Sequence, residues 1–243
     1  MGGTTGARNG SQRVKPEVDL SPIQPEESFK LKAYAALKAA IVKMDIYATR
    51  DPVMLDEREI SDRIGVSRTP VREAVAMLEQ DGFLRAVPRR GILVVKRNKR
   101  EIIEMVQAWA ALESMAVRLL TQTASNGEIT RLRDLMRGFG EDRRPDEHLT
   151  DYSTANIEFH QTIIGLAKST VLADMTDKLL LHVRGIRALT IGRDDRAKRS
   201  IEDHLAIIDA IEKRDTERAE RLSREHTLGL AAYVEAHGDE LFG

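Results

Sequence analysis

Apolar side chains recur along most of this chain at the spacing of amphipathic helices, with one short interruption of another kind. The pattern predicts helices over 29–47, over 55–64 and from Ser67 to Asp81, then β-type runs over 83–87 and 92–95. The first helix has an apolar stripe of Leu31, Tyr34, Leu37, Ile41, Met44 and Ile46. Gly82 favours a left-handed cap that ends the third helix. This order indicates a helix-turn-helix followed by a β-hairpin.

After residue 100 the periodicity is helical throughout. Predicted helices cover 99–124, 127–139, 146–168, 170–191, 196–213 and 216–236. We expect the dipeptide 126–127 to break the first of these helices, a loop over 140–145, and Asp215 to cap the last helix. Six helices joined by short loops indicate an antiparallel bundle.

The third predicted helix carries two arginines near its start. Ser67 is a suitable N-cap, and Pro70 lies in the first turn, where its missing N–H costs nothing. Arg68 and Arg72 are four residues apart and therefore share one helix face. Such a pair suits guanine edges and phosphates in a DNA major groove, although the same pattern fits a surface helix with solvated arginines.

The predicted hairpin has a basic tip over 88–91, which contains Arg89, Arg90 and Gly91. A helix-turn-helix followed by such a hairpin is a winged helix, whose tip reaches a minor groove or phosphates. We therefore predict a mainly α fold: a disordered tail over 1–28, a winged helix-turn-helix domain over 29–97, and an all-α bundle over 101–237.

The charge distribution supports this division. The net charge of −1 argues against a nucleic-acid binder, but residues 30–100 hold 16 Lys and Arg against 9 Asp and Glu. Residues 101–243 hold 19 against 26, so a basic part is joined to an acidic one. Because phosphate contacts release counterions, DNA binding should weaken steeply with salt.

Composition excludes several classes of protein. The chain has no cysteine, which excludes disulfides, thiolate metal sites and cysteine nucleophiles. No run approaches 18 apolar residues, and the N-terminal residues lack an apolar signal region. We therefore expect a cytoplasmic protein without a membrane segment.

Three histidines lie in the middle of three different predicted helices. His160, His204 and His226 have apolar neighbours, and Asn156 lies four residues before His160 on the same face. A single histidine in such a position is usually a packing residue. Three imidazoles converging in one bundle suit Zn²⁺, Ni²⁺ or Mn²⁺.

Residues 31–97 resemble the DNA-binding domain of the GntR family of bacterial transcription regulators. The resemblance rests on segments 55–60, 65–74, 78–83 and 90–91. It implies DNA contacts by Arg58, Arg68, Thr69, Arg72, Arg89, Arg90 and Gly91. The loop over 47–53 departs from the family pattern, which has a glycine and a Pro-Gly turn there.

Segments 156–160, 202–211 and 219–226 resemble the FCD ligand-binding domain of the FadR-type branch, and six helices suggest its VanR-like subdivision. The resemblance implies a metal held by Asn156, His160, His204 and His226. The family's usual aspartate is Asn156 here, which keeps an oxygen ligand but removes a negative charge. This change weakens metal binding or leaves positive charge for an anionic effector. A metal-free pocket whose histidines bind the effector directly is the alternative.

For effector binding, Trp109 stands where many members have an arginine. Trp109 is either a core aromatic or a pocket wall, and Arg184 and Arg187 are either anion partners or solvated residues.

The resemblance implies a homodimeric repressor on palindromic double-stranded DNA, released by a small carboxylate. A DNA-binding metal sensor without an organic effector is the second reading. A three-histidine metallohydrolase is disfavoured, because Glu158 faces away from the His160 side and no hydrolase motif is present.

Overall fold

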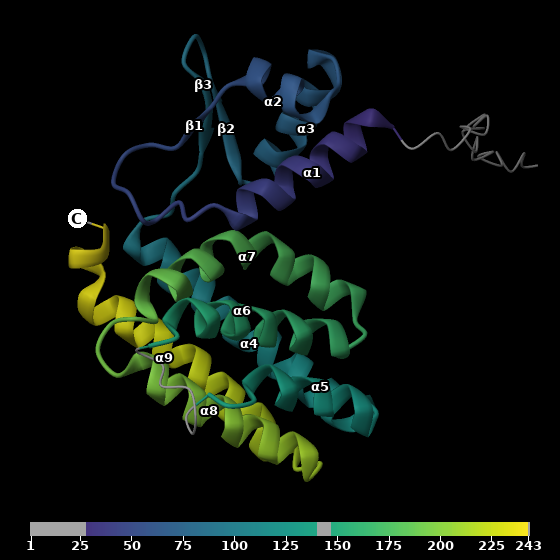
Figure 1. Ribbon diagram of the computed structural model, residues 1–243, viewed down its shortest axis with the longest axis vertical. Coiled ribbons are helices and arrows are strands. Elements are labelled where there is room, and N and C mark those ends of the chain that lie inside the picture. The colour runs from purple at the N-terminus through teal and green to yellow at the C-terminus, as the bar shows by residue number, and fades with distance from the viewer. Residues whose placement is uncertain (1–27, 140–146, 243) are drawn as a thin grey trace, which may run out of the picture.

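The computed structural model describes residues 28–139 and 147–242. The tail expected over 1–28 therefore lies outside the described residues except for Ser28, and the loop expected over 140–145 lies wholly outside them. Figure 1 shows a small N-terminal part with three strands above a bundle of helices. The predicted fold class, mainly helical with a winged helix-turn-helix and a helical bundle, is confirmed.

The N-terminal part is built from three helices and a small antiparallel sheet. Its elements are α1 (Phe29–Lys43), β1 (Met54–Leu55), α2 (Glu57–Ile64), α3 (Arg68–Gln80), β2 (Leu84–Val87) and β3 (Gly91–Val94). The strand order is β1-β3-β2. Leu37 and Ile41 of α1 pack with Leu78 of α3 and Phe83 in one buried core, which fixes α3 against α1.

The first helix is shorter than its sequence pattern predicts. It ends at Lys43 because the backbone of Met44 turns to an extended conformation, with φ −71° and ψ 137°. Ile46 is fully buried outside the helix, and Leu31 is 52% exposed instead of lying in the core. The apolar stripe therefore combines helical positions with positions of the following loop.

The helix-turn-helix and the hairpin also differ in detail from the prediction. β1 was not predicted, because two residues carry no periodicity; it pairs Met54 with Leu93. α2 begins at Glu57 after Asp56, whose carboxylate accepts hydrogen bonds from two backbone N–H groups. Ser67 is at the N-cap of α3, as predicted, although its hydroxyl makes no capping hydrogen bond.

Glycine is required where the hairpin turn enters β3. Gly91 has φ +107°, and an added Cβ would lie 2.8 Å from the carbonyl oxygen of Leu55. The close approach of β3 to β1 at this point keeps the hairpin attached to the domain core.

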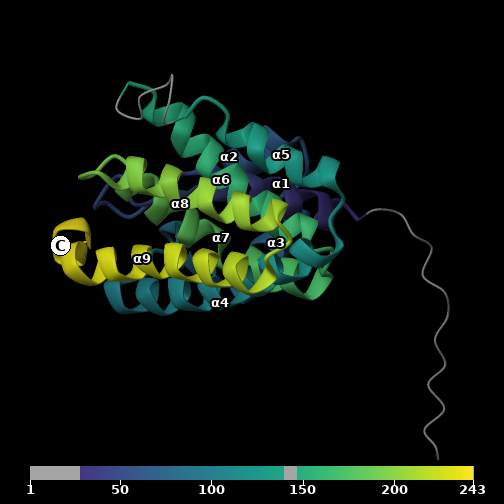
Figure 2. The ribbon, with the colours of Figure 1, turned by 90° about the horizontal axis from the view of Figure 1, so that it is seen from below.

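Six helices form the bundle in the described part of the chain, as predicted. They are α4 (Lys99–Thr123), α5 (Asn126–Met136), α6 (Leu149–Leu166), α7 (Thr170–Thr190), α8 (Arg196–Glu212) and α9 (Thr216–Phe242). α4 and α9 lie side by side along one face of the bundle (Figure 2). None of the helices in the described residues is long and apolar enough to cross a membrane.

Several helix ends in the bundle differ from the prediction; α5 ends at Met136 instead of 139, and α6 begins at Leu149 instead of 146. The break predicted at 126–127 falls at 124–125, and Asn126 and Gly127 are the first residues of α5, because Ser125 and Glu128 form a reciprocal capping box. α9 continues to Phe242, beyond the predicted end at residue 236. Asp215 accepts a hydrogen bond from the backbone N–H of Arg218, as predicted for a cap.

Tyr47, in the loop that departs from the family pattern, joins the two parts. Its hydroxyl lies 2.8 Å from Nδ1 of His182 on α7 and accepts a hydrogen bond from the backbone N–H of Arg97. Its ring packs edge-on against Phe242, and an added Cβ at Gly185 would lie 2.8 Å from the ring. Burial lowers the pKa of His182 to about 4. The winged helix therefore docks on α7 through a buried aromatic ring.

Candidate functional site

The predicted DNA-contacting residues lie together on α2, α3 and the hairpin. In Figure 1 the tip of the β2–β3 hairpin points away from the bundle. The six polar side chains of the set are exposed: Arg58, Arg68, Thr69, Arg72, Arg89 and Arg90. Cations gathered on one exposed face are the electrostatic footprint of a nucleic-acid contact.

A groove of about 470 Å³ separates α3 from the hairpin. Arg72 and Arg89 line it from opposite sides, and Glu57 of α2 lies on the same wall as Arg72. The Nε atom of Arg72 donates to both carboxylate oxygens of Glu57 at 2.9 Å. This pair orients the guanidinium through its Nε atom.

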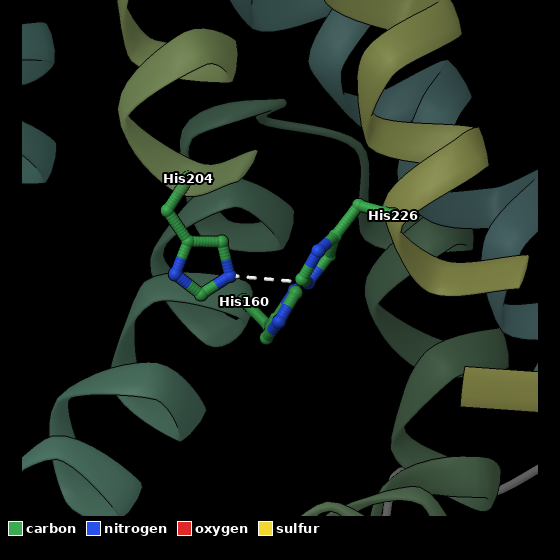
Figure 3. Close-up of side chains that lie close together, drawn as sticks. All are labelled: His160, His204 and His226. Carbon is green, nitrogen blue, oxygen red and sulfur yellow. Dashed lines mark hydrogen bonds between the residues drawn. The ribbon is translucent and has the colours of Figure 1, made fainter. Parts of the chain in front are cut away.

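The three predicted histidines meet in the bundle. Figure 3 shows the rings of His160, His204 and His226 pointing toward one another. They come from α6, α8 and α9, and one ring nitrogen of each lies within 4.8 Å of the others. The Nε2 atoms of His204 and His226 are 3.2 Å apart.

The Nδ1 atom of each ring has an oxygen partner on the side away from the other two rings. Oxygen partners are Oε1 of Glu113 at 2.5 Å for His160, the Tyr152 hydroxyl at 3.4 Å for His204, and Oδ2 of Asp203 at 2.9 Å for His226. An outward hydrogen bond at one ring nitrogen leaves the other nitrogen free to bind a metal, and metal-ligating histidines almost always have such a partner.

The electrostatic environment favours neutral imidazoles. Burial lowers the pKa of His160 and His204 well below the ordinary value of 6.5, and nearby positive charge on Arg187 and His226 lowers both pKa values further. Neutral imidazole is the form that ligates a metal, so the two rings need not lose a proton near neutral pH.

The residues present fit a divalent cation. Oδ1 of Asn156 and Nε2 of His160 are buried and have no hydrogen-bond partner in the described residues. Buried polar atoms are nearly always paired, so an unpaired acceptor beside facing imidazole nitrogens indicates a missing positive group. Three nitrogens and an oxygen are a donor set for Zn²⁺, Ni²⁺ or Mn²⁺.

Glu113 on α4 is a site residue that the sequence reasoning missed. It is fully buried, contacts His160, and accepts a hydrogen bond from Thr227 at 2.7 Å. Burial raises the pKa of Glu113, and the positive charge of Arg187, 3.9 Å away, opposes this rise. The available signal was its position four residues after Trp109, which places a carboxylate on the apolar face of the helix.

The three predicted effector residues lie in different places. Trp109 is 2% exposed in the core, where its indole N–H lies near the Glu113 carboxylate. Arg184 donates a hydrogen bond to the carbonyl oxygen of Val42 at the end of α1, away from the histidines. Arg187 is buried and donates to Thr227, and burial lowers its pKa to about 10.

A small space, the inner cavity, lies beside His226. It is lined by Asn156, Arg187, Thr190, Ile191, Arg196, Ser200, His226 and Leu230. The structure therefore brings Arg187 to the histidine site, while Arg184 lines a different groove between α1, α6 and α7.

Comparison with known families agrees with both parts of the structure. Residues 30–94 match "Bacterial regulatory proteins, gntR family", and residues 104–229 match "FCD domain". The two matches contain all predicted DNA-contacting residues and all three histidines.

Individual relatives are similar over most of their length. The HTH-type transcriptional repressor RspR of Escherichia coli is 27% identical, over 90% of this chain and 92% of its own. The "Probable D-xylose utilization operon transcriptional repressor" of Paenarthrobacter nicotinovorans is 30% identical, over 74% and 77%. The solved structure "E. coli McbR/YncC" shares the fold with a TM-score of 0.70 at 21% identity, over 88% of this chain and all of that chain.

Proposed function

We propose that this chain, which belongs to the GntR family of DNA-binding transcription regulators and carries an FCD domain, represses its target genes until a small carboxylate binds beside the three histidines. A transcriptional regulator of this family is not an enzyme, so the metallohydrolase reading is set aside. We further propose that the protein acts in the bacterial cytoplasm, with residues 29–97 and 101–237 as its two domains.

The observation that carries the proposal is the arrangement of the histidine rings. All three Nδ1 atoms face oxygen partners, so the Nε2 atoms are directed inward, where His204 and His226 approach to 3.2 Å. Asn156, His160, His204 and His226 would hold Zn²⁺, Ni²⁺ or Mn²⁺. When bound, the ion supplies positive charge and an open coordination position for a carboxylate oxygen.

The link to DNA runs along α7. Arg187 faces the inner cavity, while His182 and Gly185 of the same helix contact Tyr47 of the winged-helix domain. An anion that attracts Arg187 changes its balance with Glu113 and biases the position of α7. This coupling is allosteric only if the effector binds the two arrangements unequally.

On DNA, we propose a homodimer that places two copies of α3 in successive major grooves of a palindrome. Arg58, Arg68, Thr69 and Arg72 contact bases and phosphates there, and Arg89, Arg90 and Gly91 of the hairpin contact the neighbouring minor groove or backbone. The exposure of the polar members of this set supports these roles.

A metal sensor without an organic effector is the second candidate, favoured by the donor set itself, which needs no further ligand.

Electrophoretic mobility shift of the promoter DNA beside this chain's own gene distinguishes the acid-responsive repressor from the metal sensor. The metal-free protein is compared with protein given ZnCl₂, NiCl₂ or MnCl₂, and then with each metal plus acetate, succinate or citrate.

Release that needs both metal and acid supports the proposed function, and release by metal alone supports the sensor. Binding that no combination changes contradicts both readings. The Arg68→Ala, Arg72→Ala double variant is the control for specific binding, because a shift that survives both substitutions does not report on the predicted DNA face.

A further inference from the structure

Two arginines from different helices face the inner cavity. Arg187 comes from the last part of α7, and Arg196 is the first residue of α8. The Nε atoms of both side chains are buried without a hydrogen-bond partner in the described residues. Buried guanidinium N–H groups without acceptors indicate a ligand that supplies acceptors.

The acidic groups near these two arginines lie outside the lining of the inner cavity. Among the described residues, none of the side chains that line the inner cavity is acidic. Glu113, 3.9 Å from Arg187, is already engaged by His160 and Thr227. The guanidinium of Arg196 lies 4.4 Å from the ring centre of Tyr233, which holds it in place by a cation–π contact. Asp194 and Asp203 act on Arg196 electrostatically, but neither lines the inner cavity.

We propose that the effector carries two anionic groups, one bound by Arg187 beside the histidines and the second bound by Arg196 together with the edge of the cavity near Ser200. This inference rests on the proposed function, because it names the class of acid that the same pocket takes. A single carboxylate saturates one arginine fork in a bidentate pair, so two arginines on separate helices match a dicarboxylate.

The cavity limits the size of the ligand and the route to it. Its free space is about 10 Å³, room for about one water molecule, so the ligand is short and must displace the partly buried Arg196 side chain. A groove of about 170 Å³ on the other side of His226 is lined by Asp203 and Glu225 and therefore repels anions. The ligand enters past Arg196, which then closes on its second anionic group.

Matched pairs of acids test the charge requirement. Butyrate and succinate share a four-carbon chain, and valerate and glutarate share a five-carbon chain, but the second acid of each pair has two carboxylates. Calorimetric titration of the full-length protein, loaded with ZnCl₂, should show about tenfold or greater preference for the dicarboxylate within at least one pair. Phosphonoacetate in place of a dicarboxylate shows whether the second group is a carboxylate or a phosphonate-type anion.

Four variants test whether Arg196 binds the second group. Arg196→Met should remove the preference while leaving butyrate or valerate binding within about threefold, and Arg196→Lys should keep part of it. Arg187→Met should weaken both members of a pair. Arg199→Met, an exposed arginine one turn further along α8, should change neither. Unchanged monocarboxylate binding in Arg196→Met also shows that the variant is folded.

Equal binding of both members of every pair by the wild-type protein would overturn the inference and leave the proposed function standing. A dicarboxylate preference that persists in Arg196→Met would overturn it as well. Absence of binding by any of the acids would contradict the proposed function together with the inference.

Discussion

Arginines serve the two candidate sites in opposite surroundings. On the predicted DNA face, Arg68 and Arg72 are exposed, and Glu57 is the acidic partner of Arg72. In the bundle, Arg187 is 6% exposed and depends on Glu113 and Thr227. An exposed cation needs only a helix to carry it, whereas a buried one needs compensating groups from several helices.

The difference predicts how each site responds to substitution. Removal of an exposed arginine should reduce DNA binding and leave the fold unchanged. Removal of a group that compensates a buried charge should reduce both stability and ligand binding. Stability and binding measurements on matched variants of exposed and buried groups test this contrast.

Glu113→Ala should lower the free energy of unfolding by about 3–5 kcal/mol, because it leaves Arg187 and His160 buried without their acidic partner. Urea denaturation at neutral pH measures the loss. Glu225→Ala, which breaks an exposed pair with Arg221, should cost less than about 1 kcal/mol. Equal denaturation midpoints for the two variants would contradict the contrast, and Glu113→Gln provides a milder test if the alanine variant does not fold.

His204→Ala should weaken zinc binding by more than about 100-fold, which is the upper end of the cost of losing an outer partner of a metal ligand. Operator binding by the metal-free variant should stay within about threefold of wild type. Competition with a chromogenic chelator measures the zinc affinity. His148→Ala, a histidine outside the cluster, is the matched control, and equal zinc affinity of the two variants would exclude His204 as a ligand.

Arg68→Ala should cost roughly 1–3 kcal/mol of operator binding, with no change in the urea midpoint, because the side chain is exposed. Mobility shift at fixed salt measures the affinity. Arg199→Ala on the bundle controls for the loss of one positive charge. If both substitutions weaken binding equally, the effect comes from overall charge rather than from the predicted DNA face.

Acid should destabilise the metal-free protein through the buried histidines. The pKa values of His160 and His204 lie well below 6.5, so the unfolded chain takes up protons first as the pH falls through 6.5. Stability is therefore full above 6.5 and is lost below it, by up to about 1.4 kcal/mol per pH unit for each histidine. The raised pKa of Glu113 acts in the opposite direction, because as the pH falls the folded chain takes up that proton before the unfolded chain does.

Urea denaturation in EDTA at about pH 7.5 and about pH 5.5 measures this loss. A variant with His160→Gln and His204→Gln should show a flatter dependence. If it shows the wild-type dependence, other groups cause the loss.

The sequence was sufficient to place the predicted DNA-contacting residues on two short helices and a hairpin, because these residues are neighbours in the chain. Arg68 and Arg72 share one helix, and the turn before them is local. The histidine pattern was also readable, because each ring lies on the apolar face of its own helix. Glu113 was missed because its role depends on contacts with α6, α7 and α9 that no periodicity encodes.

The details that the sequence did not predict depend on contacts between residues far apart in the chain. Leu31 follows the helical stripe but finds no partner surface, whereas Ile46 and Tyr47 leave the helix and become buried. β1 exists because β3 lies beside it, and two residues by themselves predict nothing. The position of Arg184 at the Val42 carbonyl likewise depends on how the two parts dock.

The contact between Tyr47 and Gly185 limits which DNA-binding domains can be combined with which FCD domains. The ring belongs to the DNA-reading half, and the glycine that makes room for it belongs to the sensing half. A recombinant that joins halves from two parents can inherit a bulky ring facing a methyl group, which forces the halves apart even when each one is intact. Hybrid regulators built as biosensors from this chain should therefore carry the tyrosine and the glycine together.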